Sequence, residues 1–182
     1  MIKVESLKIP EVKLIKTETF FDSRGLFKQN YHLDEYKKNG IKNEFVQDNF
    51  SISKKNVLRG LHYQVNYPQA KLVQVIKGEA FDVAVDLREK SPTFKKWIGV
   101  ILSETNGYQL YIPRGFAHGF LALKSNTQFS YKCDNLFDDK DNSGLRWNDP
   151  DINIKWPHLS NLKISEKDKL LPFLKNTKTF LY

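Results

Sequence analysis

Short apolar runs separated by turn residues fill the middle of this 182-residue chain, and they constrain its fold more than any other feature. The run Lys71–Lys77 ends at Gly78. In the next run, Phe81–Arg88, apolar and polar residues alternate with a period of two, which is typical of a β-strand with one face in a core. Four further runs follow at intervals of about ten residues, namely Trp97–Leu102, Tyr108–Ile112, Phe120–Leu123 and Phe129–Cys133.

Helical signals are few in comparison. Leu33–Asn39, before Gly40, predicts one short helix, and Ser165–Leu171, before Pro172, predicts another. Many strands with little helix favour antiparallel pairing, because parallel strands need crossover connections that are usually helical. We therefore expect an all-β, cupin-type jelly-roll barrel with a few short helices and an open interior, in a single domain over residues 1–182.

Charge and composition exclude several classes of protein. The 29 Lys and Arg against 21 Asp and Glu give a net charge of +8, but no basic helical stripe or zinc-finger spacing accompanies it. We expect a solvated lysine-rich surface and no nucleic-acid partner, and a phosphorylated small molecule stays compatible. No apolar run approaches the roughly 20 residues of a membrane span, and the first residues lack a signal-peptide core, so we expect a cytoplasmic protein. A single cysteine excludes intrachain disulfides.

One segment carries a specific motif. Gly107–His118 has the spacing Gly-x5-Pro-x-Gly-x2-His of the second cupin motif. In metal-binding cupins this histidine joins two histidines and a glutamate from the first motif, whereas Gly60–Gln64 here contains only His62. The chain has four histidines in all, so we expect no bound metal. Neither a G-x-G-x-x-G nor a Walker pattern occurs, and we expect no nucleotide cofactor.

Without a metal or a nucleotide cofactor, any catalysis would depend on side chains inside the barrel that can transfer protons. If residues 57–64 form a strand, His62 lies on the face opposite to Arg59. Taken alone, a barrel histidine such as His62 is more often a core residue bonded to the backbone than a catalytic group. Asp82 and Asp86 either face solvent or orient an imidazole on a neighbouring strand.

Ordered sequence blocks resemble the dTDP-4-dehydrorhamnose 3,5-epimerase family from about residue 15 to residue 172. Agreement of eight blocks in the same order is far more specific than any single motif. The blocks are Phe21–Gly25, Gln47–Ser51, Leu58–Gln64, Gln69–Val73, Phe81–Arg88, Pro113–Phe120, Trp147–Pro150 and Ser165–Asp168.

The resemblance implies a homodimeric enzyme that needs no cofactor and inverts C3 and C5 of dTDP-4-keto-6-deoxy-D-glucose, giving dTDP-4-keto-L-rhamnose for deoxysugar synthesis. The ketone acidifies the hydrogens on both neighbouring carbons, because each carbanion delocalises into an enolate oxygen. Inversion needs a base on one face and a proton donor on the other. The resemblance implies His62 as the base, Asp168 as its partner, Tyr131 as the donor and Lys71 beside the enolate oxygen.

Substrate-binding positions follow from the same resemblance. Arginine suits a diphosphate because its planar fork holds two oxygens at once. The candidates for phosphate are Arg24, Arg59 and Lys167, and further candidate contacts are Gln47, Asp48, Asn49 and His118.

Three positions depart from the family pattern. Gln29 stands where a glutamate is common, Phe137 replaces a tyrosine that stacks on the base, and Asn142 replaces an acidic residue. All three concern binding, so they leave the nucleotide and the sugar more open than the reaction type. The alternatives are a C3-only or C5-only epimerase on a related keto sugar, a non-catalytic sugar-nucleotide-binding cupin, and a metal-dependent cupin enzyme.

Overall fold

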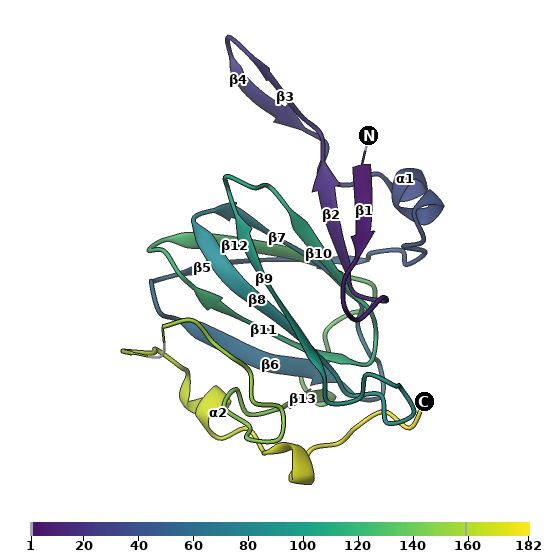
Figure 1. Ribbon diagram of the computed structural model, residues 1–182, viewed down its shortest axis with the longest axis vertical. Coiled ribbons are helices and arrows are strands. Elements are labelled where there is room, and N and C mark those ends of the chain that lie inside the picture. Colours follow the sequence, from purple (N-terminus) through teal and green to yellow (C-terminus); the bar gives the residue numbers. More distant parts are fainter. Residues whose placement is uncertain (1, 159) are drawn as a thin grey trace.

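The computed structural model describes residues 2–158 and 160–182, which form two β-sheets and little helix (Figure 1). One sheet contains β1 (Ile2–Ser6), β2 (Lys13–Thr17), β5 (Gln47–Ser53), β7 (Lys71–Lys77), β10 (Gln109–Ile112) and β12 (Thr127–Cys133). The other contains β6 (Leu58–Gln64), β8 (Glu79–Asp86), β9 (Trp97–Ser103), β11 (Phe116–Ala122) and β13 (Asn142–Gly144). The remaining elements are a hairpin of β3 (Thr19–Asp22) and β4 (Gly25–Lys28), the helices α1 (Leu33–Lys38) and α2 (Glu166–Lys169), and the 3-10 turn η1 (Leu174–Asn176).

The strand order confirms the predicted fold class. The six-stranded sheet runs β1-β2-β10-β7-β12-β5 and the five-stranded sheet runs β13-β6-β11-β8-β9. Every strand pairing within these sheets is antiparallel. The sheets face one another as the two walls of a cupin-type jelly roll. The two predicted short helices are also confirmed, as α1 and α2.

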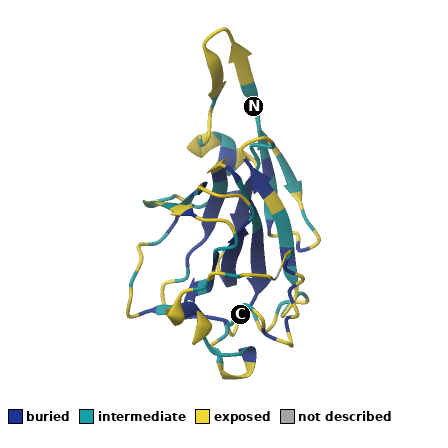
Figure 2. Ribbon diagram, turned by 90° about the vertical axis from the view of Figure 1, so that its left-hand side faces the viewer, coloured by how far each residue is buried: buried dark blue, intermediate teal, exposed yellow. Residues whose placement is uncertain are grey.

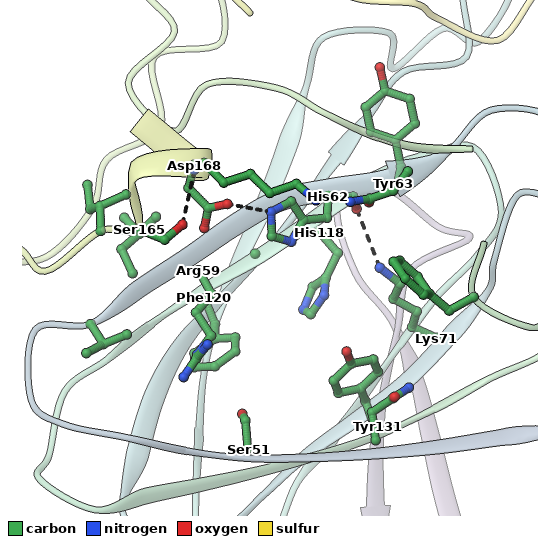
Figure 3. Close-up of a pocket in the computed structure, with 18 of the residues that line it drawn as sticks. Ser51, Arg59, His62, Tyr63, Lys71, His118, Phe120, Tyr131, Ser165 and Asp168 are labelled. Carbon is green, nitrogen blue, oxygen red and sulfur yellow. Dashed lines mark hydrogen bonds and ion pairs between the residues drawn. The ribbon is translucent and has the colours of Figure 1, made fainter. Parts of the chain in front are cut away.

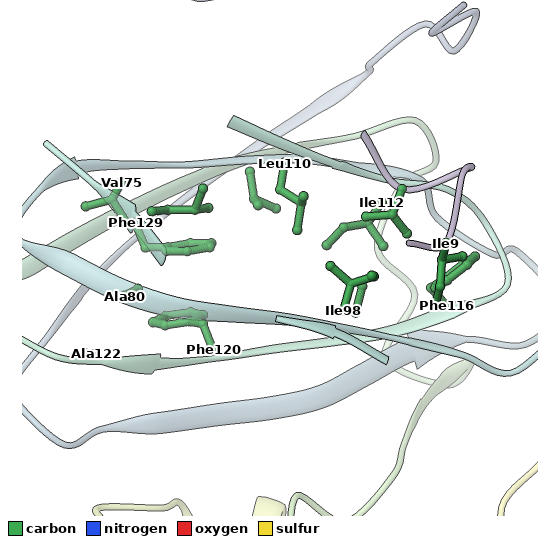
Figure 4. Packing of buried hydrophobic residues seen from close by; sticks show 14 residues of the cluster. Ile9, Val75, Ala80, Ile98, Leu110, Ile112, Phe116, Phe120, Ala122 and Phe129 are labelled. Atoms are coloured by element: carbon green, nitrogen blue, oxygen red, sulfur yellow. The ribbon is translucent and has the colours of Figure 1, made fainter. Parts of the chain in front are cut away.

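Apolar side chains fill part of the space between the sheets (Figure 4). Phe120 of β11 and Phe129 of β12 stack across this space, with ring centroids 4.0 Å apart and planes 5° from parallel. Ile98 and Leu110 belong to the same buried cluster. Burial of a large apolar side chain stabilises the folded state by about 1.5–3 kcal/mol. The cluster therefore holds the two sheets together on this side of the barrel.

The strand β8 is covered on both faces, whereas its alternating pattern predicts only one face in a core. Val83 and Val85 pack into a second cluster that includes Trp156 and Phe180 from the C-terminal segment. On the opposite face, Ala84 belongs to the cluster between the sheets. The C-terminal segment thus covers the outer face of the five-stranded sheet. The apolar side chains on the outer face of β8 are buried by this irregular segment and not by the opposite sheet.

The β3–β4 hairpin projects away from the two sheets (Figure 1) and is almost entirely exposed (Figure 2). It presents four large apolar side chains to solvent, namely Phe20, Phe21, Leu26 and Phe27. Exposed apolar side chains gathered in this way mark a docking surface more often than an ordinary surface. Among the helices described, none has the length and apolar character needed to cross a membrane.

Candidate active site

A cavity of about 940 Å³ opens between the sheets, beside the apolar cluster. Its walls come from β5, β7 and β12 on one side, from β6 and β11 on the other, and from residues 162–169 of the C-terminal segment. The predicted site residues that line it are Gln47, Asn49, Arg59, His62, Lys71, His118, Tyr131, Phe137, Asn142, Lys167 and Asp168.

His62 and Tyr131 project into this cavity from opposite walls (Figure 3). Tyr131 lies on β12, opposite Asn49 of β5 and Val73 of β7 in the six-stranded sheet. His62 lies on β6, opposite His118 of β11 in the five-stranded sheet. A substrate held between the sheets therefore has an imidazole on one face and a phenol on the other.

The imidazole of His62 is held by a buried carboxylate. Nε2 of His62 lies 2.8 Å from Oδ1 of Asp168, and the backbone N–H of Gly60 donates to Oδ2 at 3.1 Å. Burial alone raises the pKa of Asp168, but the hydrogen bond and charge of His62, together with the Gly60 N–H, outweigh it and hold that pKa below its ordinary value. An ionised carboxylate only accepts hydrogen bonds, so Nε2 carries the ring proton and Nδ1 is the free basic nitrogen.

The ionised state of Asp168 gives a stability prediction. A carboxylate whose pKa falls on folding stabilises the fold above its unfolded pKa of about 4, and this contribution is lost as the pH falls through the folded value. We expect Asp168→Asn to lower the free energy of unfolding by about 2 kcal/mol at pH 7, and the difference to shrink below about pH 4. Urea unfolding at several pH values measures this.

The matched control is Glu44→Gln, which breaks the exposed ion pair of Glu44 with Lys37. Exposed pairs contribute about 0–1 kcal/mol, so this variant should change stability little at any pH. An equal loss of stability in both variants, or a loss in Asp168→Asn that does not depend on pH, would contradict the assigned ionisation.

The face assignment within β6 is corrected by the structure. Arg59 and His62 line the same cavity, although strict alternation places them on opposite faces. The three-residue step from Arg59 to His62 pairs with a two-residue step from Phe120 to His118, which is a β-bulge. The extra residue shifts the alternation by one. Nε of Arg59 donates to Ser53 Oγ of β5 at 3.1 Å.

Lys71 and Tyr131 complete the polar lining of the central cavity. The Lys71 side chain is buried, and its Nζ donates to the carbonyl oxygen of His62 at 3.4 Å. Burial lowers the pKa of Lys71 and raises the pKa of Tyr131. The phenol is therefore protonated at neutral pH and able to donate. Cys133 pairs with Lys71 in register, and burial raises its pKa to about 11, so the thiol is protonated as well.

A second imidazole–carboxylate pair lies deeper in the barrel. Nε2 of His118 lies 2.9 Å from Oδ2 of Asp82, and both side chains are buried. Of the two alternatives that the sequence left open for Asp82, the structure therefore supports the one in which it orients an imidazole on a neighbouring strand. Asp86 bonds instead to Arg88, at 2.8 Å, outside the cavity lining. The ring centroid of His118 is 6.5 Å from that of Tyr131.

Three predicted site residues do not line the cavity within this chain. Asp48 faces outward because the inward positions of β5 are its alternate neighbours, and it pairs with Lys132 at 2.8 Å. Arg24 lies at the tip of the hairpin and pairs with Asp22 at 2.6 Å. Gln29 follows the same hairpin directly after β4. Arg24 thus lies on a projecting arm, whereas Gln29 lies at the base of that arm, between Lys28 and Asn30, which bond to Gly107 and Gln109 of the barrel.

The cavity also contains residues that the sequence reading did not select. Alternation along β5 places Ser51 on the same face as Gln47 and Asn49, and Asp48 on the other face. This period of two could have predicted Ser51 as a cavity residue. Ser165 of the C-terminal segment carries no comparable signal of a contact with the site. Among the described residues, no group of three or more His, Cys, Asp or Glu side chains is placed to hold a metal ion.

Fold and site together define the class of this protein: a cupin-type jelly roll with proton-transfer groups on both walls of its barrel. The family model for dTDP-4-dehydrorhamnose 3,5-epimerase matches residues 6–176. The chain belongs to this family.

Individual relatives agree over almost the full length. The dTDP-4-dehydrorhamnose 3,5-epimerase of Methanothermobacter thermautotrophicus is 49% identical over 158 residues, which cover 86% of this chain and 85% of that protein. The Salmonella typhimurium enzyme of the same name is 46% identical over 176 residues, which cover 96% of both chains. A solved epimerase structure from Legionella pneumophila, in complex with dTDP-4-keto-L-rhamnose, superposes with a TM-score of 0.97 at 41% identity, covering 100% of this chain and 99% of that one.

Proposed function

We propose that this protein is an epimerase that inverts C3 and C5 of dTDP-4-keto-6-deoxy-D-glucose and yields dTDP-4-keto-L-rhamnose. The observation that carries the proposal is the placement of the His62–Asp168 pair on one wall and Tyr131 on the other. Inversion at carbon requires removal of a proton from one face and delivery of a proton to the opposite face. The family membership supplies the substrate, since the Legionella relative was solved with the product named here.

Each inversion is a two-step proton transfer. Nδ1 of His62 takes the proton from the carbon beside the ketone, and the electron pair of the C–H bond moves into the carbonyl to form an enolate. The enolate then collapses while the Tyr131 hydroxyl delivers a proton to the other face of the same carbon. The imidazolium is stabilised by the ionised Asp168, and exchange with water afterwards restores both side chains.

Lys71 is the cation suited to the enolate oxygen. Its ammonium group lies in the cavity wall and donates a hydrogen bond to the carbonyl oxygen of His62. A fixed positive group stabilises a developing oxyanion most strongly where water is excluded. The buried position of Lys71 meets that condition.

The nucleotide end of the substrate has its own set of contacts in this proposal. Arg59 and Lys167 line the cavity, and their positive charges are suited to bind the diphosphate. Phe137 offers a half-exposed ring for the base to stack on, where its backbone N–H donates to Gln47 Oε1 at 2.7 Å. Asn142 lies on the same wall and offers an amide instead of a carboxylate.

The projecting hairpin supports a homodimer. Its exposed Phe20 and Phe27, with Arg24 at the tip, form an arm that reaches away from its own barrel. In the proposed dimer this arm brings Arg24 and Gln29 to the partner's cavity, where Arg24 faces the diphosphate. Sedimentation should therefore give a dimer, and Arg24→Ala should raise KM on the order of tenfold, as the loss of one charged contact to phosphate does. A monomer with unchanged KM would contradict this arrangement.

The reaction itself is tested by NMR of the product formed from dTDP-4-keto-6-deoxy-D-glucose. Vicinal coupling constants report the configuration at C3 and at C5, and the proposal requires both to be inverted. Inversion at one carbon alone would instead establish the single-carbon alternative. Binding of the substrate without any conversion would establish the non-catalytic alternative.

A further inference from the structure

The segment that carries Asp168 is anchored to the rest of the chain both before and after α2. On one side, Lys163 forms a parallel bridge with Val57 at the beginning of β6, and its carbonyl accepts the Leu58 N–H at 3.0 Å. On the other side, Nε of Arg146 donates to the Leu171 carbonyl at 2.7 Å. The four-residue helix α2 lies between these anchors and bears Asp168. A helix of one turn has little stability of its own, so its shape depends on specific contacts.

Ser165 makes such a contact at the start of α2 (Figure 3). Its Oγ accepts a hydrogen bond from the backbone N–H of Asp168 at 3.1 Å, and its carbonyl accepts the Lys169 N–H at 3.0 Å. A serine in this position satisfies one of the N–H groups that a helix leaves without a partner in its first turn. Here that N–H belongs to Asp168 itself, so the serine hydroxyl fixes the backbone from which the carboxylate extends.

The carboxylate of Asp168 is fixed from the opposite direction by β6. Gly60 N–H binds one oxygen at 3.1 Å and the His62 ring binds the other at 2.8 Å. We infer that Ser165 is a positioning residue of the active site: its hydroxyl sets the distance from the Asp168 carboxylate to Nε2 of His62. It thereby keeps the ring proton on Nε2 and leaves Nδ1 free. This inference rests on the proposed function, in which His62 is the base.

Replacement of Ser165 by alanine tests the inference through kcat and KM measured separately. We expect kcat to fall on the order of tenfold, because a small displacement of a catalytic partner costs rate, while KM changes little. Ser165→Thr keeps a hydroxyl at the same place and should restore kcat. In an Asp168→Asn background the loss caused by Ser165→Ala should nearly vanish, since both changes act on one contact.

Ser103→Ala is the matched control. Ser103 Oγ accepts the backbone N–H of Asn106 at 3.1 Å, which is the same spacing along the chain and the same distance, away from the cavity lining. This variant should leave kcat unchanged. If Ser165→Ala does not fold, Ser165→Gly takes its place, because glycine is tolerated before a helix and also lacks the hydroxyl.

A structural readout separates this inference from the proposed reaction. Nitrogen-15 NMR of His62 reports its tautomer without any substrate, and Ser165→Ala should lose the single Nε2–H form that the wild-type protein shows. An unchanged tautomer, or wild-type kcat in Ser165→Ala, would overturn the role of Ser165. A wild-type protein that has the Nε2–H tautomer but converts no substrate would instead overturn the proposed function and leave the Ser165 contact standing.

Discussion

Replacing His62 with alanine abolishes hydrogen exchange at both C3 and C5 of the keto sugar, with kcat lowered on the order of 10³-fold. We expect one imidazole to serve both carbons, because the His62 ring is held by Asp168 on the wall opposite Tyr131 and is partly exposed to the cavity, whereas the ring of His118, held by Asp82, is buried. Exchange at each carbon is measured by NMR from the loss of its proton signal in deuterated water. Binding of the nucleotide should persist, since the predicted diphosphate and base contacts remain.

An exposed histidine provides the control for this variant. His32 is the exposed N-cap residue of α1 and does not line the cavity, so His32→Gln should retain wild-type exchange at both carbons. Full activity in His62→Ala would eliminate the two-face mechanism. Loss of exchange at only one carbon would show that a different base serves the other.

Replacing Tyr131 with phenylalanine separates the two halves of the reaction. The ring and its packing remain, so the cavity keeps its shape, but the proton donor on that wall is gone. We expect inverted product to form on the order of 10²-fold more slowly, while His62 continues to exchange protons on its own face. Deuterium incorporation without inversion, followed in the same NMR experiment, is the expected signature.

Tyr111→Phe is the control for loss of a buried phenol. Tyr111 donates to Asn43 Oδ1 at 2.6 Å outside the cavity lining, and burial raises its pKa to about 12. Its removal should cost some stability and leave inversion unchanged. If Tyr131→Phe inverts both carbons at the wild-type rate, the phenol is not the donor.

The strands from β7 to β12 were the predictable part of this fold. Each has an apolar run bounded by turn residues, and Lys71–Lys77 matches β7 at both ends. The strands before β6 lack that pattern. Phe20 and Phe27 of the hairpin, for example, are exposed. A pattern that depends on one buried face therefore cannot predict these strands. The burial of the outer face of β8 could not be predicted from the sequence either, because the residues that bury it belong to an irregular C-terminal segment without periodicity.

The site shows the same division. His62 and Asp168 are 106 residues apart, and no local pattern joins them; only the family resemblance predicted their pairing, which the 2.8 Å contact agrees with. Alternation along β5 separates Gln47, Asn49 and Ser51 from Asp48, although Phe50 also lines the cavity against this alternation. It fails for Arg59 because a bulge in β6 adds a residue that period-two reasoning does not contain.

The most direct measurement of the central claim is deuterium wash-in by the wild-type protein, resolved carbon by carbon. Incubated with dTDP-4-keto-6-deoxy-D-glucose in deuterated water, the protein should place deuterium at C3 and at C5 and invert both centres. A sugar recovered with its original hydrogen at both positions would contradict the claim that His62 and Tyr131 move protons across this cavity.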